Sequence, residues 1–239
     1  MFSQTAQYYD LIYSFKDYEE ESRAVKTLIE KLQPGAQTVL DVACGTGAHA
    51  KHLADHFSVD GIDVEPGFID IASKKVPTGA FQVADMCDFH LGKCYDVVLC
   101  LFSSIGYLTQ AAQVRAALKC FKSHIGENGL ILVEPWFTPD QWQENVPFML
   151  TVDQDDLKLC RMNTSRREGD LSILDFHYLV ATSAGVEYFT EMHSLGLYTK
   201  ETMLSCFNQA GLAVEYDPQG LTGRGLYIAR SKNVGIHSA

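Results

Sequence analysis

The sequence has few positive charges and no long apolar run, and both absences narrow the functions that the chain can have. It contains 19 Lys and Arg residues against 30 Asp and Glu residues, which gives a net charge of -11. Non-specific affinity for nucleic acid comes from clustered Lys and Arg, so we expect no nucleic-acid partner. No apolar run approaches the length that spans a bilayer, and the N-terminus lacks a basic region followed by an apolar one. We therefore expect no membrane partner.

A pattern of paired cysteines is also absent. The seven cysteines are odd in number and include no C-x-x-C pair, and several lie inside apolar runs, as Cys100 does. This pattern is typical of reduced core residues and predicts a soluble cytoplasmic protein. His49, His52 and His56 have helical spacing but lack a fourth ligand at a matching spacing. We therefore expect no metal site.

One stretch, residues 38–47, organises the rest of the chain. A short apolar run leads into Asp41 and then into Gly45 and Gly47, and a helical pattern begins at Ala48. This order predicts a strand, a tight turn and the start of a helix. Glycine carries no Cβ, so a ligand can lie against bare backbone at this turn, where amide groups and a helix N-terminus point at it.

Strands and helices alternate along the chain with short connections. This rhythm predicts a parallel sheet covered on both faces, and 239 residues are enough for one large domain. A leading helix ends near Pro34. The predicted strands cover residues 38–42, 58–63, 81–84, 95–102, 130–133, 212–216 and 225–230, and the predicted helices cover residues 48–56, 67–75, 110–124 and 199–210.

The rhythm changes beyond Trp136. Residues 148–196 contain three runs in which apolar and polar residues alternate, without a helical period. Turn signals at 168–170 and 183–185 separate these runs. We expect an antiparallel insertion whose strands cover residues 157–165, 171–181 and 186–195.

Three features fall at one edge of the predicted sheet: the glycine turn, Asp63 and Asp85. In open α/β sheets, ligands bind outside the carboxyl ends of the strands. An acid in the place of Asp63 reaches the ribose hydroxyls of an adenosine ligand, although dinucleotide folds use the same acid. Ala50 stands where the dinucleotide fingerprint often has a third glycine. Asp41 suits a zwitterionic or cationic ligand better than a pyrophosphate, so an NAD-type oxidoreductase is the more distant alternative.

The stretch from Asp41 to Gly47 resembles the first motif of class I S-adenosylmethionine-dependent methyltransferases. Residues 61–63 and 84–86 are similar to the second and third motifs, and the resemblance covers about residues 38–134. It implies a doubly wound, Rossmann-like α/β fold with a seven-stranded, mostly parallel sheet. In this chain an antiparallel β insertion would follow the fifth strand. The implied cofactor is S-adenosyl-L-methionine, and the implied product is S-adenosyl-L-homocysteine.

A narrower resemblance extends over nearly the whole chain. It is to the N,N-dimethyltransferases that act on the 3-amino group of nucleotide-linked deoxyaminosugars, the desosamine and mycaminose type. It implies N-methylation of a nucleotide-linked aminosugar. Those enzymes have a longer leading segment that contributes an aromatic side chain to the substrate, and we expect Met1 to start too late to supply it. The motifs that carry this resemblance are residues 16–18, 102–108, 133–136, 165–169, 177–178 and 223–226.

The two resemblances together imply a cofactor site. Asp63 would bind the ribose hydroxyls, Asp85 the adenine amino group, and the backbone of Met86 the adenine ring. The backbone from Ala43 to Gly45 would meet the methionine part of the cofactor. The full set of expected cofactor contacts is Tyr9, Tyr18, Asp41, Ala43, Gly45, Thr46, Asp63, Val64, Asp85, Met86 and Leu101.

The acceptor site follows from the chemistry and from the second resemblance. Methyl transfer from a sulfonium mainly requires that the amine be held in a near-attack geometry. Tyr107 or His177 can orient the amine or accept its proton, and these two are the candidate catalytic residues. Glu134 could attract a cationic amine, and arginine pairs bidentately with a diphosphate. The expected substrate contacts are Tyr107, Glu134, Trp136, Arg167, His177 and Arg224.

Structural alternatives stay open for several of these residues. Glu134 could be a strand-end acid bonded to backbone, and His177 could be a satisfied structural histidine. Arg167 could belong to a solvated turn. The tyrosines of the leading segment, Tyr9 and Tyr18 among them, could instead pack in the core.

The expected organisation is a single methyltransferase domain over residues 1–239. Residues 1–35 would form an N-terminal helical lid, and residues 145–197 would form the antiparallel insertion over the acceptor site. The same insertion is a candidate surface for a homodimer. The expected partner is a small-molecule acceptor, with a nucleotide-sugar as the specific form. Another small amine or a hydroxyl acceptor is the nearest alternative, and a non-catalytic sensor of an adenosyl ligand is a further one.

Overall fold

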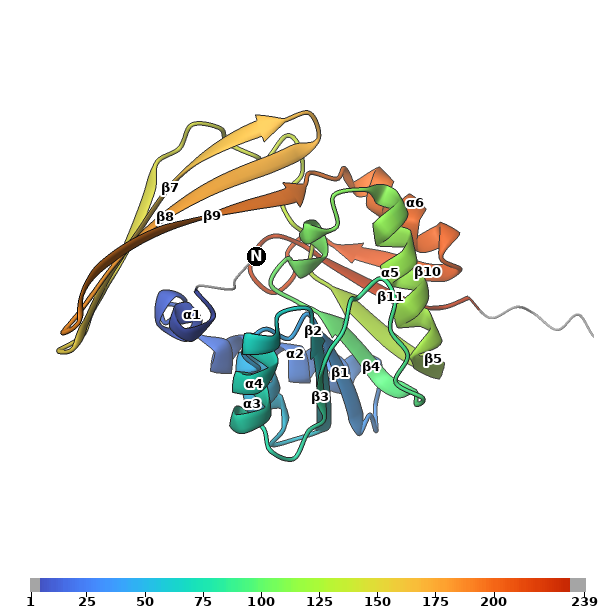
Figure 1. Cartoon of the computed structure of the whole chain (residues 1–239). Helices are drawn as coiled ribbons and strands as arrows, with labels where there is room; N and C mark the ends of the chain where they lie inside the picture. Colours follow the sequence, from blue (N-terminus) through green and yellow to red (C-terminus); the bar gives the residue numbers. More distant parts are fainter. Residues whose placement is uncertain (1–4, 233–239) are drawn as a thin grey trace, which may run out of the picture.

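The computed structural model describes residues 5–232, and at its centre is a seven-stranded sheet (Figure 1). The strand order is β10-β11-β5-β4-β1-β2-β3. The pairs among β1 to β5 are parallel, whereas β11 runs antiparallel to both β5 and β10. This arrangement confirms the predicted doubly wound, mostly parallel sheet. The strands are β1 (Thr38–Val42), β2 (Ser58–Asp63), β3 (Phe81–Val83), β4 (Tyr95–Cys100), β5 (Ile125–Val133), β10 (Leu212–Asp217) and β11 (Leu226–Ser231).

Helices cover both faces of this sheet, as the alternation of elements predicts. Successive strand residues point to opposite faces, so Val39 packs with the side of α2 and α3 while Leu40 packs with the side of α5 and α6. Helix α4 lies over β2 and β3, where Ile69 and Ala72 pack against Phe81. The helices are α2 (Tyr18–Leu32), α3 (Ala48–Leu53), α4 (Pro66–Lys75), α5 (Ala111–Ser123) and α6 (Lys200–Gln209).

One strand is longer than its apolar run. Strand β5 begins at Ile125, five residues before the predicted start at Leu130. Ile125 pairs with Tyr95, and the register then shifts before Leu130 pairs with Val97. The residues between the two pairs are polar or glycine, so the hydrophobic pattern does not indicate the first part of the strand.

The insertion forms a separate four-stranded antiparallel sheet, which we call the roof sheet. Its strands pair in chain order and curve away from the main sheet in Figure 1. The sequence predicts three of the four strands and misses the first, an edge strand whose side chains are mostly exposed. The strands are β6 (Phe148–Asp153), β7 (Leu157–Glu168), β8 (Leu171–Thr182) and β9 (Gly185–Gly196).

The N-terminal segment joins the two sheets. A 3-10 helix, η1 (Ala6–Tyr8), and a short helix, α1 (Tyr9–Ile12), lie beneath the roof sheet, and Ile12 is buried in a cluster with Phe176 and Tyr178. Helix α2, by contrast, packs on the main sheet through Val25 and Ile29. Residues 1–4 of the expected lid lie outside the described residues. Within residues 5–232, no helix is long and apolar enough to cross a membrane.

Candidate active site

The turn after β1 has the backbone geometry of a ligand-binding loop. Ala43, Gly45 and Gly47 have φ values of 57°, 55° and 73°. A Cβ on Gly47 would lie 3.0 Å from the Cβ of Ala72, so the turn needs glycine there both for its conformation and for its approach to α4. The Asp63 carboxylate accepts hydrogen bonds from the amides of Gly45 at 2.9 Å and Glu65 at 3.0 Å. The turn is therefore fixed to the end of β2.

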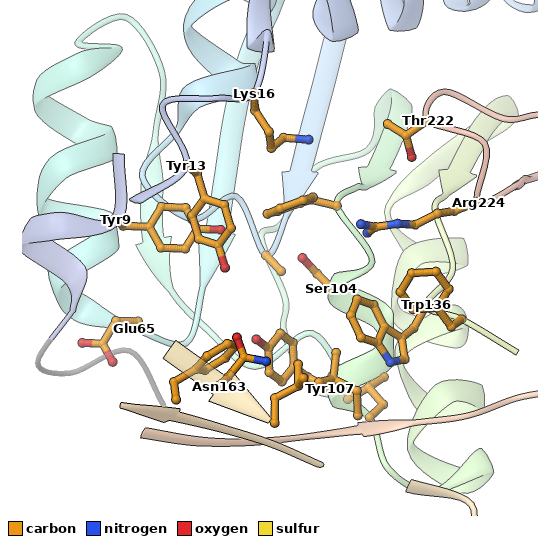
Figure 2. Close-up of a pocket in the computed structure, with 18 of the residues that line it drawn as sticks. Tyr9, Tyr13, Lys16, Glu65, Ser104, Tyr107, Trp136, Asn163, Thr222 and Arg224 are labelled. Carbon is orange, nitrogen blue, oxygen red and sulfur yellow. The ribbon is translucent and has the colours of Figure 1, made fainter. Parts of the chain in front are cut away.

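A cavity of about 1090 Å³ opens above this turn. This volume is at the upper end of the roughly 300–1,000 Å³ of typical small-molecule pockets. In Figure 2, Tyr9 and Tyr13 project from one side, and Arg224 and Trp136 project from the opposite side. Its walls come from the carboxyl edge of the main sheet, the N-terminal segment and the roof sheet.

The side chains expected to hold an adenosine lie together on one wall of this cavity. Asp63, Val64, Asp85 and Met86 all line it. Burial raises the pKa of Asp63, against backbone hydrogen bonds that lower it. Asp85 is exposed, and its side chain accepts a hydrogen bond from the amide of Cys87 at 2.8 Å. Two carboxylates at the ends of adjacent strands therefore face the cavity with acceptor oxygens.

A narrow second pocket branches from the cavity at the glycine turn. It shares Tyr9, Ala43 and Gly45 with the cavity. Among its other lining residues are the remaining expected cofactor contacts, which are Tyr18, Asp41, Thr46 and Leu101. The structure thus gathers every expected cofactor residue around two connected pockets.

Asp41 is the residue of this pocket whose buried side chain most clearly indicates a bound ligand. Its side chain is 2 % exposed, and its Oδ2 atom has no hydrogen-bond partner within the part of the chain that the structure describes. Burial raises the pKa of Asp41 to about 7, and Asp63 adds to the rise while His49 opposes it. A buried acceptor without a donor is costly, and an ammonium group would satisfy it. The site therefore fits the methionine end of S-adenosylmethionine.

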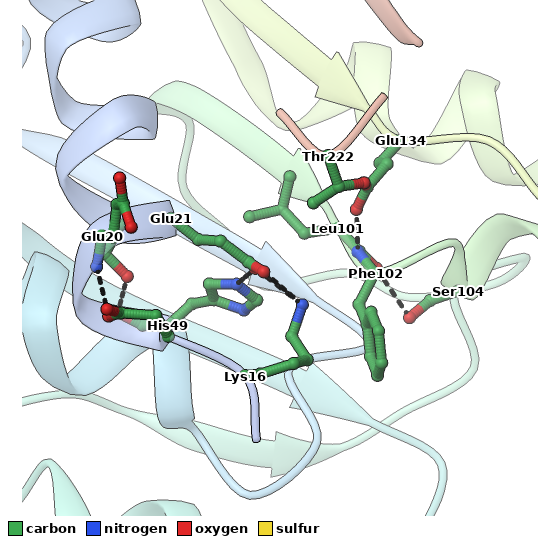
Figure 3. Close-up of polar contacts among 11 residues, drawn as sticks. Lys16, Glu20, Glu21, His49, Leu101, Phe102, Ser104, Glu134 and Thr222 are labelled. Carbon is green, nitrogen blue, oxygen red and sulfur yellow. Dashed lines mark hydrogen bonds and ion pairs between the residues drawn. The ribbon is translucent and has the colours of Figure 1, made fainter. Parts of the chain in front are cut away.

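The N-terminal segment closes the methionine end with polar contacts. The Thr46 hydroxyl donates to Asp10 at 2.5 Å, and the Lys75 ammonium lies 2.8 Å from the same carboxylate. Figure 3 shows a second cluster, in which Glu21 joins the Lys16 ammonium at 2.6 Å to His49 at 3.0 Å. Asp10 does not stand out in the sequence pattern, because its partners Thr46 and Lys75 are far away along the chain.

On the opposite wall, Arg224 lies in an aromatic setting. Its guanidinium donates to the Ser103 hydroxyl at 3.0 Å and lies 5.2 Å from the ring centroid of Phe137 and 5.5 Å from that of Trp136. Among residues 5–232, no carboxylate forms an ion pair with Arg224. Arg224, Trp136 and Tyr107 all line the cavity, as expected of acceptor contacts.

The structure places two of the expected acceptor residues, His177 and Arg167, away from the cavity lining. His177 is exposed on the outer face of the roof sheet, where its Nδ1 atom lies 2.7 Å from the Tyr188 hydroxyl. Strand alternation turns its buried neighbours Phe176 and Tyr178 inward instead. Arg167 is exposed at the β7–β8 turn, and its Nε donates to the Gly169 carbonyl at 2.7 Å. It therefore belongs to the turn and does not line the cavity.

Glu134 also lies outside the cavity lining, beneath the loop that follows β4. It is 2 % exposed, and its carboxylate accepts from the Phe102 amide at 2.7 Å and the Thr222 hydroxyl at 2.6 Å (Figure 3). Phe102 and Ser103 have φ values of 51° and 60°, which non-glycine residues adopt rarely. Glu134 therefore supports a strained loop that carries cavity residues.

The roof sheet contributes polar residues that the sequence analysis does not identify. Arg161 and Asn163 line the cavity and are 5 % and 7 % exposed. The Arg161 guanidinium donates to the Tyr13 hydroxyl at 3.2 Å and lies 4.6 Å from the Phe176 ring centroid. Polar residues at every second position of β7 were the available signal, but apolar residues stand on both faces of that strand.

The chain is similar to known methyltransferases in sequence and in fold. A family model described as "Methyltransferase domain" matches residues 39–129. A dTDP-3-amino-3,6-dideoxy-alpha-D-glucopyranose N,N-dimethyltransferase from Streptomyces fradiae is 38 % identical, over 93 % of this chain and 89 % of the relative.

Two solved structures are also similar. DesVI of Streptomyces venezuelae has a TM-score of 0.89 and 33 % identity, over 95 % of this chain and 98 % of DesVI. CalS10, described as an amino pentose methyltransferase from Micromonospora echinaspora with S-adenosylmethionine bound, has a TM-score of 0.82 and 31 % identity. The similarity spans 91 % of this chain and 92 % of CalS10.

Proposed function

Because the chain belongs to the family of S-adenosylmethionine-dependent sugar N-methyltransferases, we propose that its acceptor is the amino group of a nucleotide-linked deoxyaminosugar. The observation that carries this proposal is the position of Arg224. Its guanidinium lies among aromatic rings without a carboxylate partner among residues 5–232, across the cavity from the adenosine wall. A diphosphate supplies the charge that such a guanidinium binds bidentately.

The cofactor residues have complementary tasks in this proposal. S-adenosylmethionine, when bound, supplies an electrophilic methyl group on a sulfonium. Asp63 would accept hydrogen bonds from the ribose hydroxyls, and Asp41 would pair with the ammonium of the methionine part. The backbone of Ala43 and Gly45 would contact the part of the cofactor between the ribose and the ammonium group, because both residues line both pockets.

We expect Asp63→Ala to weaken binding of S-adenosylhomocysteine at least tenfold. The substitution removes charge-assisted contacts to the ribose, each typically worth about 1.5–3 kcal/mol. Isothermal titration calorimetry measures the affinity. Asp88→Ala is the matched control, since Asp88 is an exposed carboxylate near the same edge. A melting curve must accompany each variant, because Asp63 also holds the Gly45 amide. An unchanged affinity in a folded Asp63→Ala protein would refute this placement of the adenosine.

The acceptor amine would lie between Tyr107 and the cofactor pocket. An amine reacts only through its free lone pair, so the site must favour the neutral form. The buried Arg161 guanidinium in the cavity wall disfavours a bound ammonium by like-charge repulsion. Tyr107 offers a hydroxyl to orient the lone pair. The main contribution of the protein is then to hold the amine in a near-attack geometry and to exclude water.

The N-terminal segment and the roof sheet would enclose the two ligands. Residues 5–16 contact the glycine turn through Asp10 and the roof sheet through Thr5, whose hydroxyl donates to Glu191 at 2.8 Å. These contacts support a lid made of residues 5–16, a shorter segment than the expected 1–35, because α2 packs on the main sheet. The roof sheet supplies Arg161, Asn163 and Phe176 to the acceptor side.

Incubation with labelled S-adenosylmethionine and a panel of acceptors tests the proposed function. The panel contains nucleotide-linked aminosugars, the same sugars without the nucleotide, and simple alkylamines. Transfer to the nucleotide-linked aminosugars alone is the expected result. Equal transfer to the free sugars would remove the role proposed for the diphosphate, and transfer to hydroxyl-bearing analogues without an amine would overturn N-methylation of this acceptor.

A homodimer through the outer face of the roof sheet is also part of the proposal. Exposed apolar side chains gather on that face, and pairs such as Met149 with Met162 and Leu179 with Tyr188 lie side by side in the sheet register. Charges of both signs border them, because Lys158 pairs with Asp153 and Arg166 pairs with Asp175. A two-fold partner would bring the same mixed surface to the contact, without like-charge repulsion. The exposed apolar residues are Met149, Met162, Leu179, Val186, Tyr188 and Met192.

We expect Leu179→Glu to convert a dimer into a monomer. A buried carboxylate near the centre of a two-fold contact would face its own copy, and like charges at close range cost several kcal/mol. Size-exclusion chromatography with light scattering should give twice the 26.6 kDa chain mass for the wild type and for the control Asn208→Glu on α6. A monomeric wild type, or a dimeric Leu179→Glu, would contradict this interface.

A further inference from the structure

A series of buried ionisable side chains lies behind Tyr107, and the proposed cofactor and substrate contacts do not include them. The Tyr107 hydroxyl lies 2.8 Å from Nδ1 of His193, and Nε2 of His193 lies 3.6 Å from the Glu191 carboxylate. Glu191 in turn accepts a hydrogen bond from the Thr5 hydroxyl at 2.8 Å. His193 is 1 % exposed and Glu191 is 9 % exposed.

This series of side chains runs from the cavity into the protein. Tyr107 lines the cavity (Figure 2), whereas His193 and Glu191 are not among its lining residues. Both lie on β9 at inward positions, two residues apart. The rings of Phe176 and His193 pack edge to face, with their centroids 4.9 Å apart. The Tyr107 phenol is therefore the member of this series that a ligand in the cavity can contact.

The ring nitrogens of His193 have distinct roles in this arrangement. The Glu191 carboxylate beside Nε2 favours the tautomer that carries its proton on Nε2. Nδ1 is then the acceptor, and the Tyr107 hydroxyl donates to it. Burial, together with Tyr13, Tyr178, Glu191 and Asp63, raises the pKa of Tyr107 well above its ordinary value, so the phenol carries its proton.

We propose that Tyr107, His193 and Glu191 form a proton relay that removes the proton from the methylated amine. The inference rests on the proposed function, because it needs an amine at Tyr107. In the transfer step the N–C bond forms and the S–C bond breaks, and the amine nitrogen becomes a positively charged ammonium. The phenol then passes its proton to Nδ1 of His193 and receives a proton from the ammonium. The amine ends neutral, and the imidazolium is stabilised by Glu191.

The relay matters most when one amine receives two methyl groups. Simple alkylammonium groups have pKa values near 10.4, so a monomethylated product that keeps its proton has no lone pair for a second transfer. A bound product enclosed by the roof sheet and residues 5–16 cannot readily release that proton to water. The relay would restore the lone pair without release of the sugar. Its loss should therefore make the enzyme stop at the monomethyl product.

Tyr107 is the catalytic residue of this relay, and His193 is a positioning residue that acts through it. For His193→Gln we expect kcat to fall about 10- to 100-fold, within the range by which general acid–base groups contribute, with the KM for the nucleotide-sugar within threefold. Monomethyl product should accumulate. The loss should shrink as the pH rises toward 9.5, because hydroxide takes over the proton. The ionisable and charged groups around the relay are Tyr9, Tyr13, Asp63, Arg161, Tyr178 and Glu191.

A matched pair on the other face of the same sheet supplies the control. His177 and Tyr188 form a hydrogen bond of 2.7 Å on the outer surface, away from the cavity. His177→Gln and Tyr188→Phe therefore remove the same chemical groups as His193→Gln and Tyr107→Phe. The outer pair should leave kcat, the pH profile and the ratio of monomethyl to dimethyl product unchanged.

Nuclear magnetic resonance of protein labelled with 15N-histidine provides a readout that does not require turnover. In the wild type, the His193 ring nitrogens should show the Nε2-protonated tautomer, and Tyr107→Phe should shift the Nδ1 resonance while Tyr188→Phe should not. An Nδ1 resonance insensitive to Tyr107→Phe overturns the relay whatever the turnover. An active wild type whose His193→Gln variant keeps its pH profile and product ratio overturns the relay alone. A wild type inactive on every amine overturns the proposed function instead.

Discussion

Asp41→Asn should weaken binding of S-adenosylhomocysteine about 10- to 100-fold and should, at pH 8, make the unliganded protein more stable than the wild type. The first effect follows from the loss of a charge-assisted hydrogen bond to the ammonium of the ligand, worth about 1.5–3 kcal/mol. The second follows from the burial of Asp41 and from its Oδ2 atom, which no described residue satisfies.

The sign of the stability effect follows from the two pKa values of Asp41. In the unfolded chain the carboxyl group ionises near its ordinary value, whereas burial raises the folded pKa to about 7. The folded state therefore holds a proton that the unfolded state releases, and stability falls as the pH rises from about 4 to about 7. The difference corresponds to at most on the order of 4 kcal/mol, and an asparagine avoids this loss.

Thermal melting at pH 4 and pH 8, together with calorimetry, checks both effects. The melting temperatures of Asp41→Asn and wild type should be similar at pH 4, and the variant should melt higher at pH 8. Wild-type affinity for S-adenosylhomocysteine should increase from pH 6 to pH 8 as Asp41 ionises, and the affinity of the variant should change less. Equal affinity of the two proteins at pH 8 would remove Asp41 from the cofactor site.

Arg224→Ala should raise the KM for a nucleotide-linked aminosugar by about 30-fold or more, with little change in cofactor affinity. Truncating one partner of a buried, hydrogen-bonded charge pair typically costs 2–5 kcal/mol. The aromatic rings of Phe102, Trp136 and Phe137 shield the guanidinium from water, which strengthens its attraction to a diphosphate.

Two variants sharpen this experiment. Arg224→Lys keeps the charge but not the bidentate fork, so it should recover only part of the loss. Arg167→Ala removes an exposed arginine at the β7–β8 turn and should leave KM unchanged. Steady-state kinetics with the nucleotide-linked sugar and with the free sugar completes the design. If Arg224→Ala affects both acceptors equally, the guanidinium does not bind the diphosphate.

The main sheet and the cofactor wall could be predicted from the sequence because their signals are local. The turn at Gly45 and Gly47 follows directly from β1, and Asp63 and Asp85 follow or end strands whose apolar runs are short and clear. Parallel strands bring their carboxyl ends to one edge, so the acids meet without further information. The edge strand β6 was missed because its side chains are largely exposed and give no buried run.

The acceptor wall was harder to predict because its residues depend on which face of the roof sheet each alternate strand position occupies. His177 and His193 both stand in alternating strands, yet the first points outward and the second inward. Apolar residues occur on both faces of the roof sheet, so the pattern alone does not tell which face is the inner one. The roles of Glu134 and Arg224 depend on contacts with Phe102 and Ser103 in a loop far away in the sequence.

The alternation of strand residues between two faces also limits how the roof sheet can change during evolution. Adjacent residues of β7 and β8 alternate between the inner face, where Arg161 and Tyr178 are buried, and the outer surface, where Met162 and Leu179 are exposed. Deletion of one residue within a strand would exchange the two faces beyond that point and would damage both at once. Acceptor preference should therefore diversify by substitution at inward positions, while gains and losses of residues concentrate in the turns at 169–170 and 183–184.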